Sequence, residues 1–133
     1  MCVFCSIVEG KIPAYVVLDR DHVLAFLDIN PVARGHTLVI TKRHYESLLD
    51  VPKEELSELF EAAKAIGKAL LAYGYEGVNF LSNAGKAAGQ EIMHVHIHVI
   101  PRRQNDGLFK RPQTRRASKE ELEATAKALR ELL

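Results

Sequence analysis

The sequence contains no tryptophan, only two cysteines and no apolar run that could cross a membrane. Its longest apolar runs, at residues 23–27 and 38–40, fall far short of the ~20 residues that a transmembrane helix needs. An excess of one charge is also lacking, because 18 Lys and Arg residues against 17 Asp and Glu residues leave a net charge of +1. We therefore expect no membrane partner, and nucleic acid is a poor candidate because no overall field attracts it.

The first residues show no basic leader, no long apolar stretch and no small-residue cleavage site, which argues against secretion and predicts a cytoplasmic protein. In a reducing compartment, two cysteines three positions apart suggest metal binding or redox chemistry rather than a structural disulfide. The chain has 133 residues, of which 47% are hydrophobic and 26% charged, as is usual for one globular domain. This composition excludes a disordered or fibrous chain.

Three short runs in the first third of the chain have the composition of β-strands. Residues 16–18 and 23–28 are rich in β-branched and aromatic side chains, and the polar turn between them contains Asp19 and Asp21. Residues 36–41 form the third run. We expect three antiparallel strands here.

A helical period follows, since apolar residues recur at intervals of three and four between residues 53 and 72. Pro52 suits the first turn of this helix and Gly74 suits its end. We expect the apolar stripe to face a sheet. The stripe consists of Leu56, Leu59, Phe60, Ala63, Ile66 and Leu70.

The chain then returns to strand-like sequence. We expect a strand over residues 78–81, a glycine-bearing loop over residues 83–90 and a strand over residues 94–100 that is closed by Pro101. The order of elements predicts an α+β domain, with the helix on one face of an antiparallel sheet.

Residues 102–116 differ from the rest of the chain, because they hold six basic residues against one acidic residue, Asp106. A solvated connector and contact with a polyphosphate or nucleic acid are both open interpretations. Beyond this segment, Ser118 and Glu121 have the spacing of a capping box, which predicts a C-terminal helix. We expect residues 1–101 to form the main body, and residues 102–133 to pack on it or on a second subunit. The apolar positions of the helix are Leu122, Ala126, Leu129 and Leu133.

Three of the six histidines alternate within five positions, at His94, His96 and His98. Side chains two apart on a strand point to the same side, so we expect the three imidazoles on one face and valine and isoleucine on the other. A satisfied core residue is the usual explanation of a lone buried histidine, but three aligned rings each need partners for donor and acceptor. The pattern therefore favours a metal site, or imidazole chemistry at phosphorus or a carbonyl.

The segment from His94 to Ile100 resembles the signature of the histidine-triad family of nucleotide hydrolases and transferases, in which histidines alternate with apolar residues. Blocks at residues 23–31, 36–44 and 83–90 are similar to the other blocks of that family and follow in the same order. The resemblance implies a five-stranded antiparallel sheet carrying one long helix. It also implies a homodimer, in which the long helix and an edge strand meet their copies across a two-fold axis.

The resemblance also implies roles for individual residues. His96 would attack the α-phosphorus of a nucleotide and form a nucleotidyl-imidazole intermediate that water hydrolyses, while its other ring nitrogen donates to a fixed acceptor. His98 and His36 would bind the phosphate oxygens and orient or protonate the leaving group. Asp28 would accept hydrogen bonds from both ribose hydroxyls. The purine pocket would comprise Val3, Phe4, Ile7, Phe26 and Ile29, and the contacts to the α-phosphate and leaving group would be Asn83, Gly89 and Gln90.

The residues themselves leave other interpretations open. Asp28 can simply start a turn, and the apolar residues of the purine pocket can be core. Gly85 and Gly89 can serve a plain turn as well as an anion-binding nest. One position departs from the family, because Glu91 stands where many of its phosphoramidases have Ser after the Gln. A carboxylate there would disfavour an anionic leaving group and favour a cationic amine.

Cys2 and Cys5 have the two-residue gap that lets both thiolates reach one tetrahedral ion. A redox pair is disfavoured because no strand precedes the motif and no clear long helix follows it, whereas free thiols that bind nothing are an open alternative. The resemblance implies that His44 and His94 complete the site, as in a subset of the family and in the related galactose-1-phosphate uridylyltransferases. Four protein ligands would make a closed, structural zinc site.

The resemblance to the histidine-triad family implies a hydrolase of purine nucleoside 5′-phosphoramidates or related adenylyl derivatives. The first alternative is a dinucleoside polyphosphate hydrolase, favoured by the basic segment that can hold extra phosphates. The second is a nucleotide-binding or scaffold protein with incidental activity, because active-site residues do not reveal how much a site is used.

Overall fold

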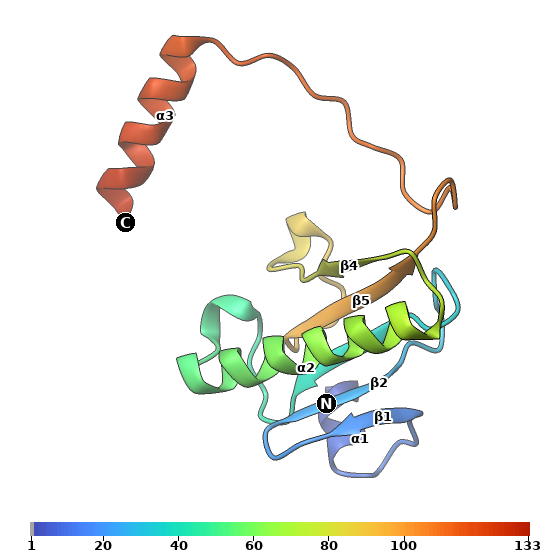
Figure 1. Ribbon diagram of the computed structural model, residues 1–133. Helices are drawn as coiled ribbons and strands as arrows, with labels where there is room; N and C mark the ends of the chain where they lie inside the picture. Colours follow the sequence, from blue (N-terminus) through green and yellow to red (C-terminus); the bar gives the residue numbers. More distant parts are fainter. Residues whose placement is uncertain (1) are drawn as a thin grey trace.

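The computed structural model describes residues 2–133 of the chain. Its strands form one antiparallel sheet in the order β1-β2-β3-β5-β4, which confirms the predicted α+β fold (Figure 1). Within these residues, no helix is long and apolar enough to cross a membrane. The strands are β1 (Val16–Asp19), β2 (Val23–Leu27), β3 (Thr37–Thr41), β4 (Gly77–Leu81) and β5 (His96–Arg102); the helices are α1 (Val3–Val8), α2 (Lys53–Tyr73) and α3 (Lys119–Leu132), with short 3-10 turns at η1 (Leu48–Asp50) and η2 (Lys86–Ala88).

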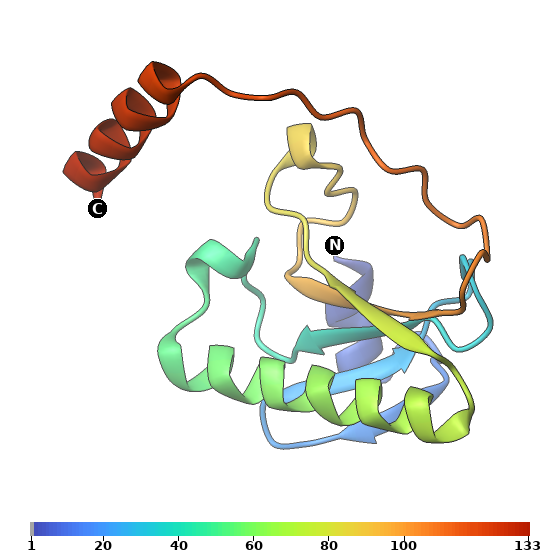
Figure 2. The same cartoon turned by 45° about the horizontal axis from the view of Figure 1, so that its top comes forward.

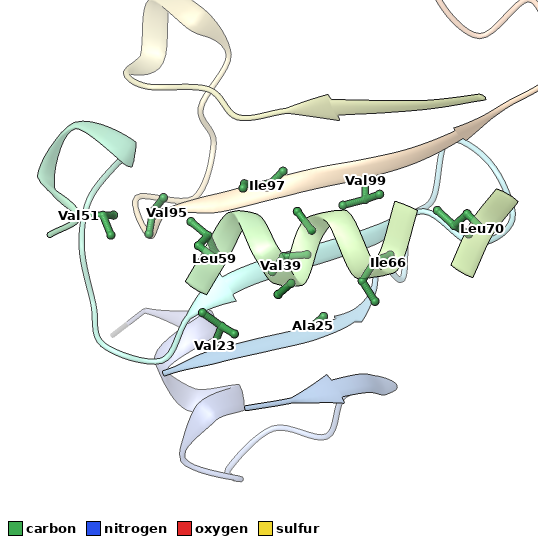
Figure 3. Close-up of a cluster of buried hydrophobic side chains, with 12 residues drawn as sticks. Val23, Ala25, Val39, Val51, Leu59, Ile66, Leu70, Val95, Ile97 and Val99 are labelled. Atoms are coloured by element: carbon green, nitrogen blue, oxygen red, sulfur yellow. The ribbon is translucent and has the colours of Figure 1, made fainter. Parts of the chain in front are cut away.

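The main core lies between α2 and one face of the sheet (Figure 3). The predicted helix is confirmed as α2, with Pro52 at its N-cap and Gly74 at its C-cap. Most of the predicted stripe is buried against the sheet, and Leu59 is fully buried. The placement of Phe60 on the buried stripe is wrong, since its side chain is 46% exposed. It follows Leu59 directly and is therefore turned about 100° away from it around the helix axis.

A smaller core covers the opposite face of the sheet. Here Phe4 of α1 packs against four apolar side chains of β2 and β3. The sequence analysis predicts no helix at this place, because α1 has only six residues and its N-cap, Cys2, makes no side-chain capping bond. Tertiary contacts, not a local signal, therefore hold α1. The four partners are Leu24, Phe26, Leu38 and Ile40.

The prediction for the last strand is wrong at both ends. The strand begins at His96, so His94 lies in the bend before it, and Pro101 lies inside the strand rather than closing it. Pairing with β3 ends at Val99, so only β4 flanks Pro101. A proline fits there because one side of the strand no longer needs an N–H donor.

The arm that follows β5 leaves the body. Residues 103–118 are extended and irregular, and α3 lies well away from the sheet in both views (Figures 1 and 2). Ser118 caps α3 as predicted, accepting a bond from the Glu121 N–H (3.1 Å). No residue of α3 is buried, so α3 does not pack on its own body. Packing on a second subunit stays a prediction.

Candidate active site and metal centre

A cavity of about 540 Å³ opens on the face of the sheet opposite α2. It is large enough for a nucleotide-sized ligand. The alternation of β5 explains its position, because Ile97 and Val99 face α2 while His96 and His98 line the cavity. Helix α1, strand β2 and the segment after β4 form the remaining walls.

The ring of His96 is held by the backbone just before it. Its Nδ1 lies 2.7 Å from the carbonyl oxygen of His94, so Nδ1 carries the proton and donates it. Burial lowers the pKa of His96, which keeps the ring neutral. The other nitrogen, Nε2, therefore carries a free lone pair. The His96 backbone is fixed in turn by Ser82, whose hydroxyl donates to the His96 carbonyl (2.7 Å).

His36 and His98 form a hydrogen-bonded pair beside His96. The backbone N–H of Val32 donates to His36 Nδ1 (3.2 Å), so this nitrogen is an acceptor. In neutral His36 the proton is then on Nε2, which donates to His98 Nδ1 (3.0 Å). Neutral His98 must consequently carry its own proton on Nε2. Burial lowers the pKa of both rings, in His98 to about 4, so both are neutral near pH 7.

Asp28 lies at the end of β2 beside this pair. One carboxylate oxygen accepts the Asn30 N–H (2.8 Å), as expected of a residue that starts a turn. The other lies 3.6 Å from His36 Nε2, and the residue lines the cavity. Asp28 thus serves the turn and also presents a carboxylate to the cavity.

The atoms of Asp28, His36 and His98 are close enough to be considered as a metal site. The hydrogen bonds argue against it. A metal on His36 Nε2 would need the proton on Nδ1, but Nδ1 faces the Val32 N–H donor. Two donors would then face each other, so this cluster is a hydrogen-bond relay.

A different cluster, of Cys2, Cys5, His44 and His94, has the geometry of a metal site. His94 Nδ1 lies 3.4 Å from Cys2 Sγ, 3.6 Å from Cys5 Sγ and 3.2 Å from His44 Nδ1. A zinc ion about 2.3 Å from sulfur and about 2.0 Å from nitrogen needs ligand atoms roughly 3.3–3.8 Å apart. The spacing therefore fits a tetrahedral Cys₂His₂ centre.

Neighbouring groups orient His94 for metal binding and keep its ring neutral. His94 Nε2 donates to the Thr41 carbonyl (2.7 Å), which leaves the lone pair of Nδ1 aimed into the cluster. Burial lowers the pKa of His94, so the ring is neutral. Burial and the nearby Cys2 thiol raise the pKa of Cys5, and a cation would offset that effect.

Comparison with known proteins matches a HIT domain to residues 9–105, most of the chain. The chain belongs to the HIT family. It is 50% identical over 107 residues to an uncharacterized HIT-like protein of Methanocaldococcus jannaschii, covering 80% of this chain and 83% of the relative. The adenosine 5′-monophosphoramidase HNT1 of Saccharomyces cerevisiae is 43% identical over 109 residues, covering 81% of this chain and 67% of that one. The adenylylsulfatase HINT3 of Arabidopsis thaliana is 40% identical over 118 residues, covering 88% and 60%.

Solved HIT structures share the fold over nearly the whole chain. A HIT family member from Bacillus subtilis superposes with a TM-score of 0.90 at 36% identity, covering 99% of this chain and 96% of the other. A zinc-bound histidine triad protein from Mycobacterium smegmatis reaches a TM-score of 0.78 at 38% identity, covering 99% and 97%.

Most of the residues expected for nucleotide binding line the cavity on the face of the sheet opposite α2. Val3 and Ile29 are exposed at its rim, at 39% and 77%, whereas Phe4 and Phe26 are buried, so these two serve the core as well. Asp28 and the catalytic candidates lie there too. The expected residues that line the cavity are Val3, Phe4, Ile7, Phe26, Asp28, Ile29, His36, Asn83, Gly89, His96 and His98.

Gln90 is the exception, because it is buried in the loop and does not line the cavity. Its Oε1 accepts the Gly85 N–H (2.8 Å), and its Nε2 donates to the carbonyls of Glu46 (2.6 Å) and Ile92 (3.1 Å). The side-chain amide thus holds the loop that carries Asn83 and Gly89. Gly89 is left-handed (φ +92°), a conformation that favours glycine.

The sequence analysis missed several lining residues, including Pro13, Leu81, Ile92 and Phe109. Three of them have no chemical signal beyond being apolar. Phe109 had one, since it is the only aromatic residue of the basic segment. The Arg102 guanidinium lies 5.1 Å from the centre of its ring, which helps to bring it back over the cavity.

Proposed function

We propose that this HIT protein hydrolyses purine nucleoside 5′-phosphoramidates or related adenylyl derivatives through a nucleotidyl-histidine intermediate on His96. The orientation of the His96 ring carries the proposal, because the His94 carbonyl holds the proton on Nδ1 and leaves the Nε2 lone pair free. The likeness to relatives named as an adenosine 5′-monophosphoramidase and an adenylylsulfatase supports it.

In the first step, His96 Nε2 forms a bond to the α-phosphorus, and the bond from phosphorus to the leaving group breaks. An amine leaving group takes up a proton from solvent water as it departs. In the second step, water attacks the same phosphorus and the bond to Nε2 breaks, which returns the electron pair to the ring. The attacking water releases one proton, so His96 ends in its starting state.

His98 has a different role from His96 in this reaction. Since its Nδ1 accepts from His36, its Nε2–H is the group that can donate to a non-bridging phosphate oxygen. Charge on these oxygens rearranges as the leaving group departs, and a fixed donor stabilises it without reorganising. His36 acts as a positioning residue for His98.

The charges of the cavity favour an amine as leaving group. Asp28 and Glu91 are its acidic lining residues, and no Lys or Arg is among the described residues that line it. A polyphosphate or sulfate leaving group would meet a carboxylate at Glu91, whereas an ammonium would be attracted to it. We therefore place phosphoramidates ahead of dinucleoside polyphosphates.

One observation favours the polyphosphate alternative. A shallow groove beside the cavity shares Leu81, Ile100 and Phe109 with it and is also lined by Lys110 and Arg111. Extra phosphates could be held there. Comparing kcat/KM for adenosine 5′-phosphoramidate and for a diadenosine polyphosphate separates the two functions, and a clear preference for the polyphosphate would reverse our order.

Replacing His96 with glycine tests the mechanism. The variant should lose about 10⁴-fold or more in turnover, because the attacking atom is gone, while AMP should still bind since the walls of the cavity are intact. The matched control is His22→Ala, which removes an exposed histidine paired with Glu58 outside both clusters. Turnover by the His96 variant at the wild-type rate would disprove covalent catalysis at His96.

We also propose that Zn²⁺ fills the cluster of Cys2, Cys5, His44 and His94, that the protein is cytoplasmic and that it is a homodimer. The cluster geometry and the zinc-bound relative support the metal. The outer edge of β4 pairs with no strand among residues 2–133, and the side chains of Phe80 and Leu81 are exposed, which supports a second subunit. Elemental analysis of the purified protein should find about one zinc per chain.

A further inference from the structure

Few local interactions stabilise helix α1. It has six residues, its N-cap makes no side-chain capping bond, and no acidic residue lies in its first turn or basic residue in its last. A helix this short is not stable alone in water. Its position therefore depends on what its side chains contact.

The side chains of α1 and its N-cap serve two sites at once. Cys2 and Cys5 belong to the metal cluster, while Val3, Phe4 and Ile7 line the nucleotide cavity. The two sets alternate within six residues, so the metal ligands and one wall of the cavity belong to the same short segment.

Phe4 lies between the two centres. Its ring packs edge-on against His94 of the metal cluster (5.8 Å between ring centres) and against His96 (5.2 Å). His94 makes a second connection, because its ring belongs to the cluster while its carbonyl orients His96. The metal ligands and the cavity are thus joined through α1 and through the bend that precedes β5.

We propose that the metal ion held by Cys2, Cys5, His44 and His94 sets the affinity for nucleotide, by fixing α1 as a wall of the cavity. The inference rests on the proposed nucleotide binding. Without the metal, the wall must be ordered each time a nucleotide binds, and the free energy of that ordering is lost from binding. We expect the Kd for AMP to rise about tenfold or more when the metal is removed.

The rest of the fold should survive metal removal. The larger core between α2 and the sheet contains no residue of α1 and none of the four ligands. His96 also keeps its bond to the His94 carbonyl, since that bond uses no atom of the cluster. The expected change is therefore local to α1.

Two measurements on the same samples test the proposal: calorimetric titration with AMP, and hydrogen exchange of the α1 amides. The samples are the zinc-loaded protein, the chelator-treated protein and the variant Cys5→Ser, with His22→Asn as a matched control outside both clusters. Chelation and Cys5→Ser should each weaken AMP binding and speed exchange in α1, while exchange in α2 stays slow. Added zinc should restore the chelated wild type and not the variant.

The outcomes separate this proposal from the proposed function. If the zinc-loaded protein does not bind AMP, nucleotide binding fails whatever α1 does. If AMP binds equally with and without zinc, or α1 exchange is unchanged, the coupling is overturned and the function stands. Fast exchange throughout the sheet after chelation would also overturn it, because the metal would then hold the whole fold.

Discussion

At the scale of single residues, two backbone groups fix which ring nitrogen of the neighbouring histidines carries the proton. The His94 carbonyl accepts a hydrogen bond from His96 Nδ1–H, so Nε2 of His96 carries a free lone pair. The Val32 N–H fixes His36, which in turn makes His98 show an N–H. A ring nitrogen with a free lone pair and a ring N–H donor thus lie side by side, and backbone groups alone distinguish them.

The lowered pKa of His98 makes stability depend on pH. Its pKa falls from 6.5 to about 4 in the folded chain, chiefly because the ring is buried. Between these values the unfolded chain binds the extra proton, so this contribution to stability is full above pH 6.5 and is lost as pH falls toward about 4. The unfolding temperature should therefore fall over this range, and less steeply in His98→Asn. Parallel curves for the two proteins in calorimetry would contradict the assignment to His98.

Glu91 should control the choice of leaving group. Glu91→Gln keeps the size of the side chain and removes its charge, so an anionic leaving group should be repelled less. We expect the ratio of kcat/KM for adenylyl sulfate to that for a phosphoramidate with an ammonium-bearing leaving group to rise about threefold to tenfold. Glu123→Gln, an exposed change on α3, is the control. An unchanged ratio would show that Glu91 does not face the leaving group.

At the scale of elements, the loop between β4 and β5 depends on the amide of Gln90. Gln90→Ala would leave the Gly85 N–H and the carbonyls of Glu46 and Ile92 without these bonds. We expect a loss of about 1–3 kcal/mol in the free energy of unfolding, together with weaker nucleotide binding. Gln113→Ala, an exposed position in the arm, should change stability by less than about 0.5 kcal/mol. Equal stabilities of the two variants in urea denaturation would contradict the anchoring role.

How far an element could be predicted depended on where its stability comes from. Helix α2 was predictable because its apolar period and flanking residues are local signals. Helix α1 was not, since Phe4 and the cysteines hold it through partners far away in the sequence. The predicted start of β5 was wrong for a similar reason. The Val95 N–H donates to the Tyr45 carbonyl (2.8 Å), which lies outside the sheet, and the ring of His94 lies against that of His44.

The candidate site, too, has parts that the sequence predicts and parts that only the fold reveals. The alternating histidines and the Cys2–Cys5 spacing predicted the residues of the candidate site, and the structure brings these residues into one cavity and one cluster. The relay through Val32 and the anchoring by Gln90 involve backbone groups. Backbone groups have no sequence signature, so only the fold could reveal them.

At the scale of the whole molecule, the larger core and the candidate site lie on opposite faces of one sheet. The larger core faces α2, and the cavity and metal cluster face away from it. The arm lines the cavity with Phe109, but its last part packs on neither face. Its helix α3 exposes Leu122 and Leu129, at 58% and 55%, with no partner in the described chain that buries them. A 14-residue amphipathic helix is marginal in water unless its apolar side is covered.

A second copy of the chain is the cover that we expect for α3. The match to the Bacillus subtilis structure spans 99% of the chain and hence reaches into the arm, so an arm in this position is not peculiar to this chain. Deleting residues 118–133 should raise the dimer dissociation constant about tenfold or more in sedimentation equilibrium, because the apolar contacts of α3 are removed. AMP should still bind the truncated chain, since the cavity is lined by residues that precede residue 110. The double substitution Leu122→Asp and Leu129→Asp should reproduce the deletion, whereas Glu120→Gln should not. A full-length chain that sediments as a monomer at micromolar concentration would contradict the proposed dimer.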